Sequence, residues 1–219
     1  VDFQREISII AARSSRGDVV LYPPTENRHH KGILLTSIAP AAKLPQDFTA
    51  QGHEFIQRLL EALDYVGVLA MECFVTAEGL MVNELAPRVH NSGHWTLRSK
   101  ATSQFENHLR AILGMRLGST QVNGYDGIIN ILGPYDRAHA LQALSSASML
   151  TDYNKSFGPL RKLGHINVSR NRHEDILEEL GRLQYWLYAR DERTDEPAGE
   201  RLKALKTLQP GSALPAAHG

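Results

Sequence analysis

The sequence predicts an α+β fold, and three observations support this interpretation. Short β-type runs such as REISIIAAR and VVLYP are separated by turn compositions such as SSRGD. Longer runs place apolar residues at helical spacing. Hydrophobic residues make up 42% and charged residues 22% of the 219 residues, which is ordinary for a globular protein. This length allows one large domain or two small ones.

Charge and cysteine content exclude some classes of function. Lys and Arg total 24, as do Asp and Glu, so the formal net charge is zero. A broad electrostatic grip on nucleic acid or on an anionic membrane is therefore not expected, although a local basic cluster could hold a small phosphate. Cys73 is the one cysteine. It excludes an internal disulfide and a Cys-based zinc site, and it favours a reducing cytoplasm.

Turn-forming and helix-capping residues divide the first part of the chain into predicted elements. The order expected is a β-hairpin at 5–13 and 19–23, a polar loop TENRHHKG at 25–32, a strand at 32–40, a helix at 45–65, and strands at 66–75 and 80–86. Ser103 and Glu106 then form a capping-box start for another helix, which Gly114 is placed to end.

A second block begins after Gly118. Its expected elements are a strand at 127–133, a helix at 137–150, β-like runs at 149–154 and 164–170, and a helix at 174–188. From Asp191 onward the chain is charged and then rich in Pro, Ala and Gly. We therefore expect a body at 1–120, a small C-terminal module at 121–190 and a flexible tail at 191–219.

Two glutamates on neighbouring predicted strands form the first candidate site. If residues 77–79 are a three-residue loop, the pairs counted outward are Thr76 with Leu80, Phe74 with Val82, and Glu72 with Glu84. Facing Cβ atoms lie about 5 Å apart. Two bare carboxylates at that distance repel by roughly 3 kcal/mol at an effective dielectric constant of about 20. A divalent cation such as Mg²⁺ would offset this repulsion directly.

Three interpretations of this pair remain open at this point. Both glutamates could lie on a solvated sheet face, or the register could differ by one residue. A proton shared between the two carboxyls is another solution to the same repulsion. The twelve-residue spacing alone does not separate a metal site from such a dyad.

A cluster of polar residues follows Glu84 within ten positions, namely Arg88, His90, Asn91, Ser92 and His94. Arg offers a planar fork for a carboxylate or phosphate, and Gly93 lets the backbone come close to a ligand. The cluster suits an oxyanion beside a metal. The alternatives are a polar surface loop, and a site in which His90 and His94 join Glu84 as metal ligands.

Several segments together resemble a known family. MECF, NELAPRVHNSGHWT and SQFENHLRAI, with the opening strand pair and its Glu-Asn-x-His loop and the closing YNKSFGPLRKLGHINV, resemble N5-carboxyaminoimidazole ribonucleotide synthetase. The match covers about residues 1 to 190. The resemblance implies the C-terminal lobe of an ATP-grasp fold, a mostly antiparallel sheet with flanking helices, plus a small α/β module.

The resemblance also implies a reaction. ATP and bicarbonate would give carboxyphosphate, which carboxylates the amine of 5-aminoimidazole ribonucleotide in purine biosynthesis, with ADP and phosphate as products. Mg²⁺ and ATP are implied, and biotin is not. The implied partners are these small molecules and a second copy in a homodimer, with no nucleic acid and no membrane.

The resemblance assigns roles residue by residue. Glu72 and Glu84 would bind Mg²⁺. Arg88, His90, Asn91 and Ser92 would line the bicarbonate pocket. The residues expected at the nucleotide are Val1, Glu6, His29, Asn83 and Glu84. Lys155, Arg161 and Lys162 would bind the ribonucleotide 5′-phosphate. Without the resemblance, Glu6 is a solvated acid, His29 an exposed histidine and the basic cluster a solvated loop.

The chain also departs from the family pattern. Ala86 stands where many ATP-grasp enzymes have Asn, so metal binding rests on the two glutamates. GPLRK at 158–162 replaces the usual Arg-Pro-Gly-Arg-Lys and lacks one cation. The family's N-terminal domain and glycine-rich lid would lie upstream of Val1, the expected last hinge residue. We therefore expect the chain alone to turn over little or no ATP.

Two other functions stay open on the sequence. Another ATP-grasp ligase, such as a formate-using transformylase or a biotin carboxylase, shares the paired glutamates but not the HNSGHW run. A non-catalytic lobe that binds only nucleotide or metal is the third possibility.

Overall fold

The computed structural model describes residues 1–133, 137–156, 158 and 160–188, so the predicted tail at 191–219 lies outside the described residues. The described residues form one nine-stranded sheet in which every pair of neighbours is antiparallel. The strands are β1 (Arg5–Arg13), β2 (Val19–Leu21), β3 (Thr25–His30), β4 (Ile33–Ala39), β5 (Gly67–Val75), β6 (Leu80–Ala86), β7 (Tyr125–Leu132), β8 (Ser148–Asp152) and β9 (Lys162–Arg170).

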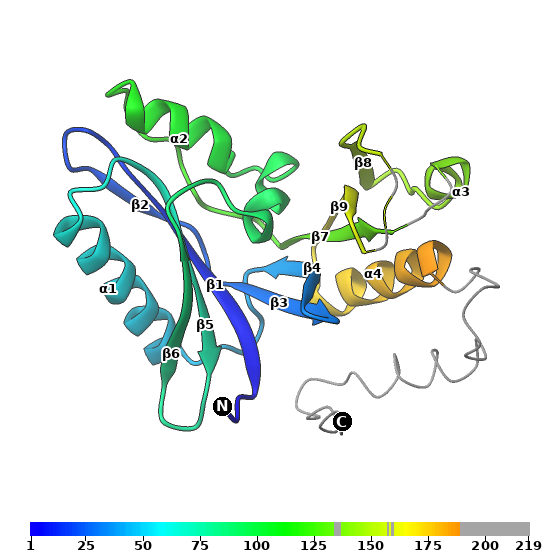
Figure 1. Ribbon diagram of the computed structural model, residues 1–219, viewed down its shortest axis with the longest axis horizontal. Helices are drawn as coiled ribbons and strands as arrows, with labels where there is room; N and C mark the ends of the chain where they lie inside the picture. The colour runs from blue at the N-terminus through cyan, green and yellow to red at the C-terminus, as the bar shows by residue number, and fades with distance from the viewer. Residues whose placement is uncertain (134–136, 157, 159, 189–219) are drawn as a thin grey trace.

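Four α-helices and one 3₁₀-helix are described around this sheet. They are α1 (Gln46–Ala62), η1 (Asn91–Leu97), α2 (Gln104–Ile112), α3 (Arg137–Gln142) and α4 (His173–Tyr188). The strand order is β6-β5-β1-β3-β4-β7-β9-β8, with β2 paired to β1. In Figure 1, α1 covers one face of β1, β5 and β6, while α4 lies against β7 and β9. The α+β, mostly antiparallel architecture is confirmed.

Apolar residues at helical and strand spacing make three cores among the described residues. Ile56 and Leu60 of α1 have no exposed surface and pack on Ile9 and Met71 of the sheet. A second core forms where α4 packs on β4, β7 and β9. The third core contains Trp95 of η1, which is fully buried and donates its indole N–H to Thr25 Oγ1 at 3.0 Å. Trp95 thereby ties η1 to β3.

Residues 25–30 of the segment TENRHHKG form β3 and not the loop that the composition predicts, and Lys31 and Gly32 make the turn to β4. The polar residues of β3 are explained by buried hydrogen bonds across three strands. Asn27 donates from Nδ2 to Ser8 Oγ at 2.6 Å, and Ser37 donates to Asn27 Oδ1 at 2.8 Å. A buried polar residue whose partners lie on neighbouring strands gives no apolar pattern, so pairing overrides composition here.

The helix predicted at 137–150 is also wrong in length. α3 ends at Gln142 and β8 begins at Ser148. In between, Ser148 Oγ accepts from the backbone N–H of Ser145 at 2.7 Å and donates to the carbonyl of Ser145 at 3.1 Å. Serine side chains that bond the nearby backbone compete with the helix, which explains the early stop.

The start of α2 bears out the Ser103 half of the predicted capping box, whereas the Glu106 side chain bonds Arg110. Ser103 is the N-cap, and its side chain accepts a hydrogen bond from the backbone N–H of Glu106 at 3.1 Å. The helix closes at Leu113, and Gly114 follows with φ +64°. A left-handed glycine just after the last turn is a common helix stop.

We expect Ser103→Ala to lower the free energy of unfolding by about 1 kcal/mol, because one N–H of the first turn of α2 loses its acceptor. Urea unfolding of the two chains measures the difference. The matched control is Ser15→Ala, which removes an exposed turn hydroxyl and should change stability by less than about 0.5 kcal/mol. Equal losses in both variants would contradict the role of the cap.

Candidate functional site

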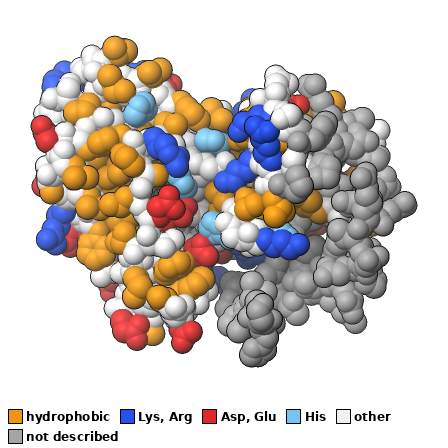
Figure 2. Space-filling view, in the orientation of Figure 1, with side chains coloured by type: hydrophobic (Ala, Val, Ile, Leu, Met, Phe, Trp, Pro, Cys, Tyr) orange, Lys and Arg blue, Asp and Glu red, His pale blue; other side chains and the backbone are white. Residues whose placement is uncertain are grey.

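An open pocket of about 530 Å³ lies between β1, β5 and β6 on one side and β3, β4 and β9 on the other. Figure 2 shows acidic side chains and histidines bordering the hollow between the two parts of the molecule, with Lys and Arg side chains across from them. The residues lining the pocket are Glu6, His29, Gly32, Ile33, Leu34, Glu72, Phe74, Asn83, Glu84, His90, Leu160 and Lys162.

Glu72 and Glu84 face each other across β5 and β6, as the sequence predicts, but by a different pairing. The predicted pairs Thr76 with Leu80 and Phe74 with Val82 are wrong. The loop is one residue longer, because the N–H and the hydroxyl of Thr76 both donate to Gly79 O, at 2.9 and 3.0 Å. The observed pairs are Val75 with Leu80, Phe74 with Met81, Cys73 with Val82 and Glu72 with Glu84.

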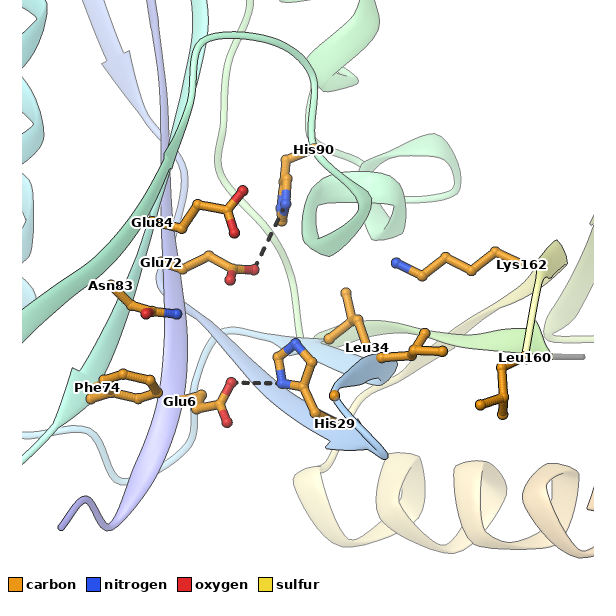
Figure 3. A pocket seen from close by; sticks show the side chains of 12 residues that line it. Glu6, His29, Leu34, Glu72, Phe74, Asn83, Glu84, His90, Leu160 and Lys162 are labelled. Carbon is orange, nitrogen blue, oxygen red and sulfur yellow. Dashed lines mark ion pairs between the residues drawn. The ribbon is translucent and has the colours of Figure 1, made fainter. Parts of the chain in front are cut away.

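A β-bulge restores the predicted facing of the two glutamates. The register shifts between Cys73 and Glu72, which leaves Asn83 as an extra residue in β6. A bulge re-aims side chains that strict alternation would send to opposite faces. Asn83 and Glu84 are neighbours in the chain, yet both line the pocket, as Figure 3 shows. The longer loop and the bulge therefore cancel in their effect on register.

The pKa of Glu72 reflects the burial of this one member of the pair. The Glu72 side chain is 15% exposed. Burial raises the pKa of Glu72, and Glu84 and Glu6 raise it further, whereas His29 and Lys162 lower it. Glu84 is exposed. Among the described residues no group of three or more His, Cys, Asp or Glu side chains is placed to hold a metal. The two glutamates fit a Mg²⁺ ion that takes its remaining ligands from a phosphate and water.

Glu6 and His29, predicted separately, form an ion pair in the wall of the pocket. Glu6 Oε2 lies 2.6 Å from His29 Nδ1. His29 reaches this position at a second register shift, where Leu35 is an extra residue in β4 opposite the step from Arg28 to His29. A carboxylate fixed in this way is an acceptor for hydroxyl donors of a ligand.

His90 points its ring at the glutamate pair from the bend after β6. The backbone N–H of Ser92 donates to His90 Nδ1 at 3.4 Å, and Ser92 Oγ lies 2.8 Å from the same nitrogen. A neutral His90 therefore carries its proton on Nε2. His90 Nε2 lies 3.7 Å from Glu72 Oε1. Burial lowers the pKa of His90 to about 4, with Arg88, Lys162 and His29 adding to the effect.

Four residues were predicted to line a bicarbonate pocket, and of these His90 is the one that lines the pocket described above. Ser92 has no exposed surface and bonds the His90 ring. Asn91 and Asn130 exchange side-chain hydrogen bonds of 3.2 and 2.7 Å. Arg88 is exposed and donates to Val89 O at 3.1 Å.

The predicted phosphate-binding cations are placed differently from one another. Lys162 lines the pocket, and burial lowers its pKa, whereas Glu72 raises it. A third register shift, with Leu163 extra in β9, accompanies Lys162. Lys155 and Arg161 lie outside the pocket lining. Lys155 Nζ is 5.0 Å from the centre of the Tyr153 ring, and Arg161 donates to Ser156 Oγ at 2.7 Å.

Val1 and Leu160, two positions that the family pattern marks, differ in their relation to the pocket. Val1 is 79% exposed and does not line the pocket. Leu160, where the family motif has glycine, lines the pocket with φ +56°. That left-handed conformation is strained for a branched side chain, which explains why glycine suits the position.

Sequence reasoning missed several residues of the site. Phe74 lines the pocket and stacks on Phe3 with ring centres 4.5 Å apart. Asn130 holds Asn91 from β7, a contact between residues 39 apart in the chain that no local pattern reveals. Gln104 bonds the bend at three points. The SQFENHLRAI motif contains Gln104, but no local pattern in the sequence assigns this residue a role.

Comparison with known proteins finds families and relatives that match this chain. The ATP-grasp domain family matches residues 1–105, and the phosphoribosylaminoimidazole carboxylase C-terminal domain family matches residues 127–179. N5-carboxyaminoimidazole ribonucleotide synthase of Aquifex aeolicus is 42% identical over 200 residues, which are 90% of this chain and 53% of that protein. The Escherichia coli synthase is 45% identical over 170 residues, 77% of this chain and 47% of that protein.

In sequence and in fold the chain is similar to about half of N5-carboxyaminoimidazole ribonucleotide synthases.

Solved structures of synthases have the same fold. The Thermus thermophilus synthetase has a TM-score of 0.81 and 45% identity, covering 86% of this chain and 52% of that one. The Aspergillus clavatus synthase, in complex with ADP and 5-aminoimidazole ribonucleotide, has a TM-score of 0.77 and 29% identity, covering 83% and 51%. The chain spans about half the length of the curated relatives it matches. None of the helices described is both long and apolar enough to cross a membrane.

Three buried histidines predict a loss of stability on acidification. Burial lowers the pKa of His94 to about 3 and those of His90 and His165 to about 4, from 6.5. Between these values and 6.5 the unfolded chain binds more protons than the folded chain. The stabilisation is therefore present above about pH 6.5 and falls as the pH drops, by about 1.4 kcal/mol per pH unit for each histidine.

Urea unfolding between about pH 7 and pH 5 measures this slope. Glu72 and Asp126, whose pKa values are raised by burial, act with the opposite sign and reduce the net slope. Replacing one contributor, in His165→Gln, should make the slope shallower by the share of one histidine. A free energy of unfolding that stays flat or rises on acidification would refute the assignment.

Proposed function

We propose that the chain supplies the metal- and acceptor-binding half of an ATP-grasp ligase. The complete enzyme would carboxylate 5-aminoimidazole ribonucleotide with ATP and bicarbonate, through carboxyphosphate, to give N5-carboxyaminoimidazole ribonucleotide in purine biosynthesis. The observation that carries the proposal is the facing of Glu72 and Glu84 in one pocket that also contains the Glu6–His29 pair, His90 and Lys162. The names of the relatives support the reaction.

Glu72 and Glu84 would hold Mg²⁺, because this ion takes oxygen ligands and often combines one or two carboxylates with substrate phosphates. When bound, Mg²⁺ neutralises charge on nucleotide phosphate oxygens. Asn83 and the Glu6–His29 pair, in the same pocket, would contact the nucleotide, with Glu6 accepting from its ribose hydroxyls. Val1 would be the last residue of the hinge, as the family resemblance implies. No biotin is part of the proposal.

His90 and Arg88 would face the bicarbonate-derived anion. The Nε2–H of a neutral His90 is a fixed donor next to the glutamate pair, and burial keeps the ring uncharged at neutral pH. Fixed donors in a water-poor site stabilise charge that develops on transferred oxygens. Asn91 and Ser92 would contribute by holding the bend, since their side chains are bonded to Asn130 and His90.

Lys162, Lys155 and Arg161 would bind the 5′-phosphate of 5-aminoimidazole ribonucleotide. Lys162 is in the pocket wall, and the other two lie on the segment that leads into it. Because the Arg161 guanidinium already bonds Ser156, its contribution would require an exchange of partners. Lys162 is the cation of this set with the strongest structural support.

Organisation and surroundings complete the proposal. The lobe at 1–120 and the module at 121–190 would form one homodimeric cytoplasmic enzyme with the remainder of the ATP-grasp fold, and would bind neither nucleic acid nor membrane. The zero formal net charge supports the last point. Because the chain spans about half the length of its relatives, a lobe that binds nucleotide and metal without catalysis is the second candidate.

Titration of the chain with Mg–ADP tests the metal site. We expect Glu84→Gln to weaken binding at least roughly tenfold, because one of two carboxylate ligands is lost. The matched control is Glu78→Gln, which makes the same change in the exposed loop of the same hairpin and should leave the affinity unaltered. Equal affinity for all three proteins, or binding indifferent to Mg²⁺, would remove the basis of the proposal.

Titration with 5-aminoimidazole ribonucleotide separates the two candidates. Lys162→Gln should weaken binding roughly tenfold to a hundredfold, the value of a hydrogen bond to a charged group. Lys100→Gln removes an exposed lysine elsewhere and is the control. A chain that binds Mg–ADP but not the ribonucleotide would favour the nucleotide-binding lobe, and so would a ribonucleotide affinity that does not change in Lys162→Gln.

A further inference from the structure

The side chain of Gln104 bonds both the N–H and the C=O of His90, and the C=O also accepts from the backbone N–H of Gly93 at 3.0 Å. His90 has extended φ and ψ of −123° and 150°, so its N–H and C=O point to the same side, as in a strand. His90 N donates to Gln104 Oε1 at 2.9 Å, and Gln104 Nε2 donates to His90 O at 2.7 Å. The carboxamide of Gln104 therefore pairs with His90 as a neighbouring strand residue would.

A third hydrogen bond from the same amide fixes the state of His94. Gln104 Nε2 lies 2.9 Å from His94 Nδ1. The orientation of the amide is not ambiguous, because a peptide N–H must donate and a peptide C=O must accept. Nε2 therefore donates its second hydrogen to Nδ1, and a neutral His94 carries its proton on Nε2. Its ring is held between Phe105 and His165, with centres 5.3 and 5.2 Å away.

The surroundings of Gln104 are built to place it. Gln104 is the first residue of α2, has no exposed surface, and donates its own N–H to Thr96 Oγ1 at 3.0 Å. Thr96 in turn donates to Gly93 O at 2.7 Å. A Cβ atom on Gly93 would lie 2.6 Å from Gln104 Oε1 and 2.7 Å from Ile10 Cδ1. The glycine of the HNSGHW run therefore makes room for the glutamine.

We propose that Gln104 is a positioning residue of this pocket, which acts through His90 and His94. By fixing both peptide groups of His90, it sets the place from which the His90 ring reaches Glu72. By donating to Nδ1, it holds a neutral His94 in one tautomer. The link from Gln104 to catalysis rests on the proposed function, in which His90 faces the reacting anion. The structural part stands on the geometry of the bend alone.

The test is Gln104→Glu, read by NMR of the imidazole nitrogens in the chain without nucleotide. A carboxylate accepts from His90 N but has no hydrogen for His90 O or for His94. We expect wild-type His94 to show an unprotonated Nδ1 and a protonated Nε2. In the variant, Nδ1 should move to the protonated region, the pKa of His94 should rise, and the His90 signals should shift. Gln121→Glu, at an exposed position, is the control and should show the wild-type pattern.

If Gln104→Glu does not fold, Gln104→Met provides the test. Methionine keeps the length of the side chain and removes all three hydrogen bonds to His90 and His94. His94 should then populate both tautomers. The proposal is overturned if His94 is protonated on Nδ1 in the wild-type chain, or if a folded variant keeps the wild-type signals of both histidines. Since the spectra need no ligand, a failed Mg–ADP titration beside the expected imidazole pattern would refute the proposed function alone.

Discussion

The repulsion between two facing carboxylates is the constraint around which the pocket is organised. Glu72 and Glu84 come from neighbouring strands, and burial of Glu72 excludes the water that would otherwise screen them. Lys162 and His29 stabilise the charged form of Glu72 from the opposite wall. His90 adds a neutral donor. Because Lys162 and His29 offset the charge of Glu72 only in part, the two facing acids are suited to receive a cation together with its anionic ligand.

Register shifts explain how a continuous antiparallel sheet forms such a pocket. Strict alternation would send every second side chain of a strand away from the ligand. The three shifts in the sheet place an extra residue at Leu35, Asn83 and Leu163, and each lies beside a lining residue. Bulges also increase the local twist and bend of a strand. The same irregularities therefore aim the side chains and curve the sheet around the space they face.

The sequence predicts those parts of this structure that depend on local period and caps. The amphipathic helices and the hairpin of Glu72 and Glu84 are of this kind. The predicted loop of that hairpin is one residue too short and its bulge is not predicted, and because these two errors cancel, the glutamates face each other as predicted. The strand β3 was missed because Asn27 owes its burial to Ser8 and Ser37 on other strands. Contacts between distant segments leave no local period, so neither the buried polar ladder nor the place of Gln104 could be found from the sequence.

In the bend after β6, part of the polar motif bonds other protein groups and does not line the pocket. Four of its side chains were predicted to line the pocket, yet Ser92 and Asn91 are engaged with His90 and Asn130. This division would suit the stabilisation of an oxyanion, which is the role proposed for His90. A donor that must stay fixed while charge moves cannot rely on water to hold it, because water would reorganise with the charge. Buried partners on the inner side of the bend supply that rigidity, and in the proposed function they would hold His90 in place for its anion.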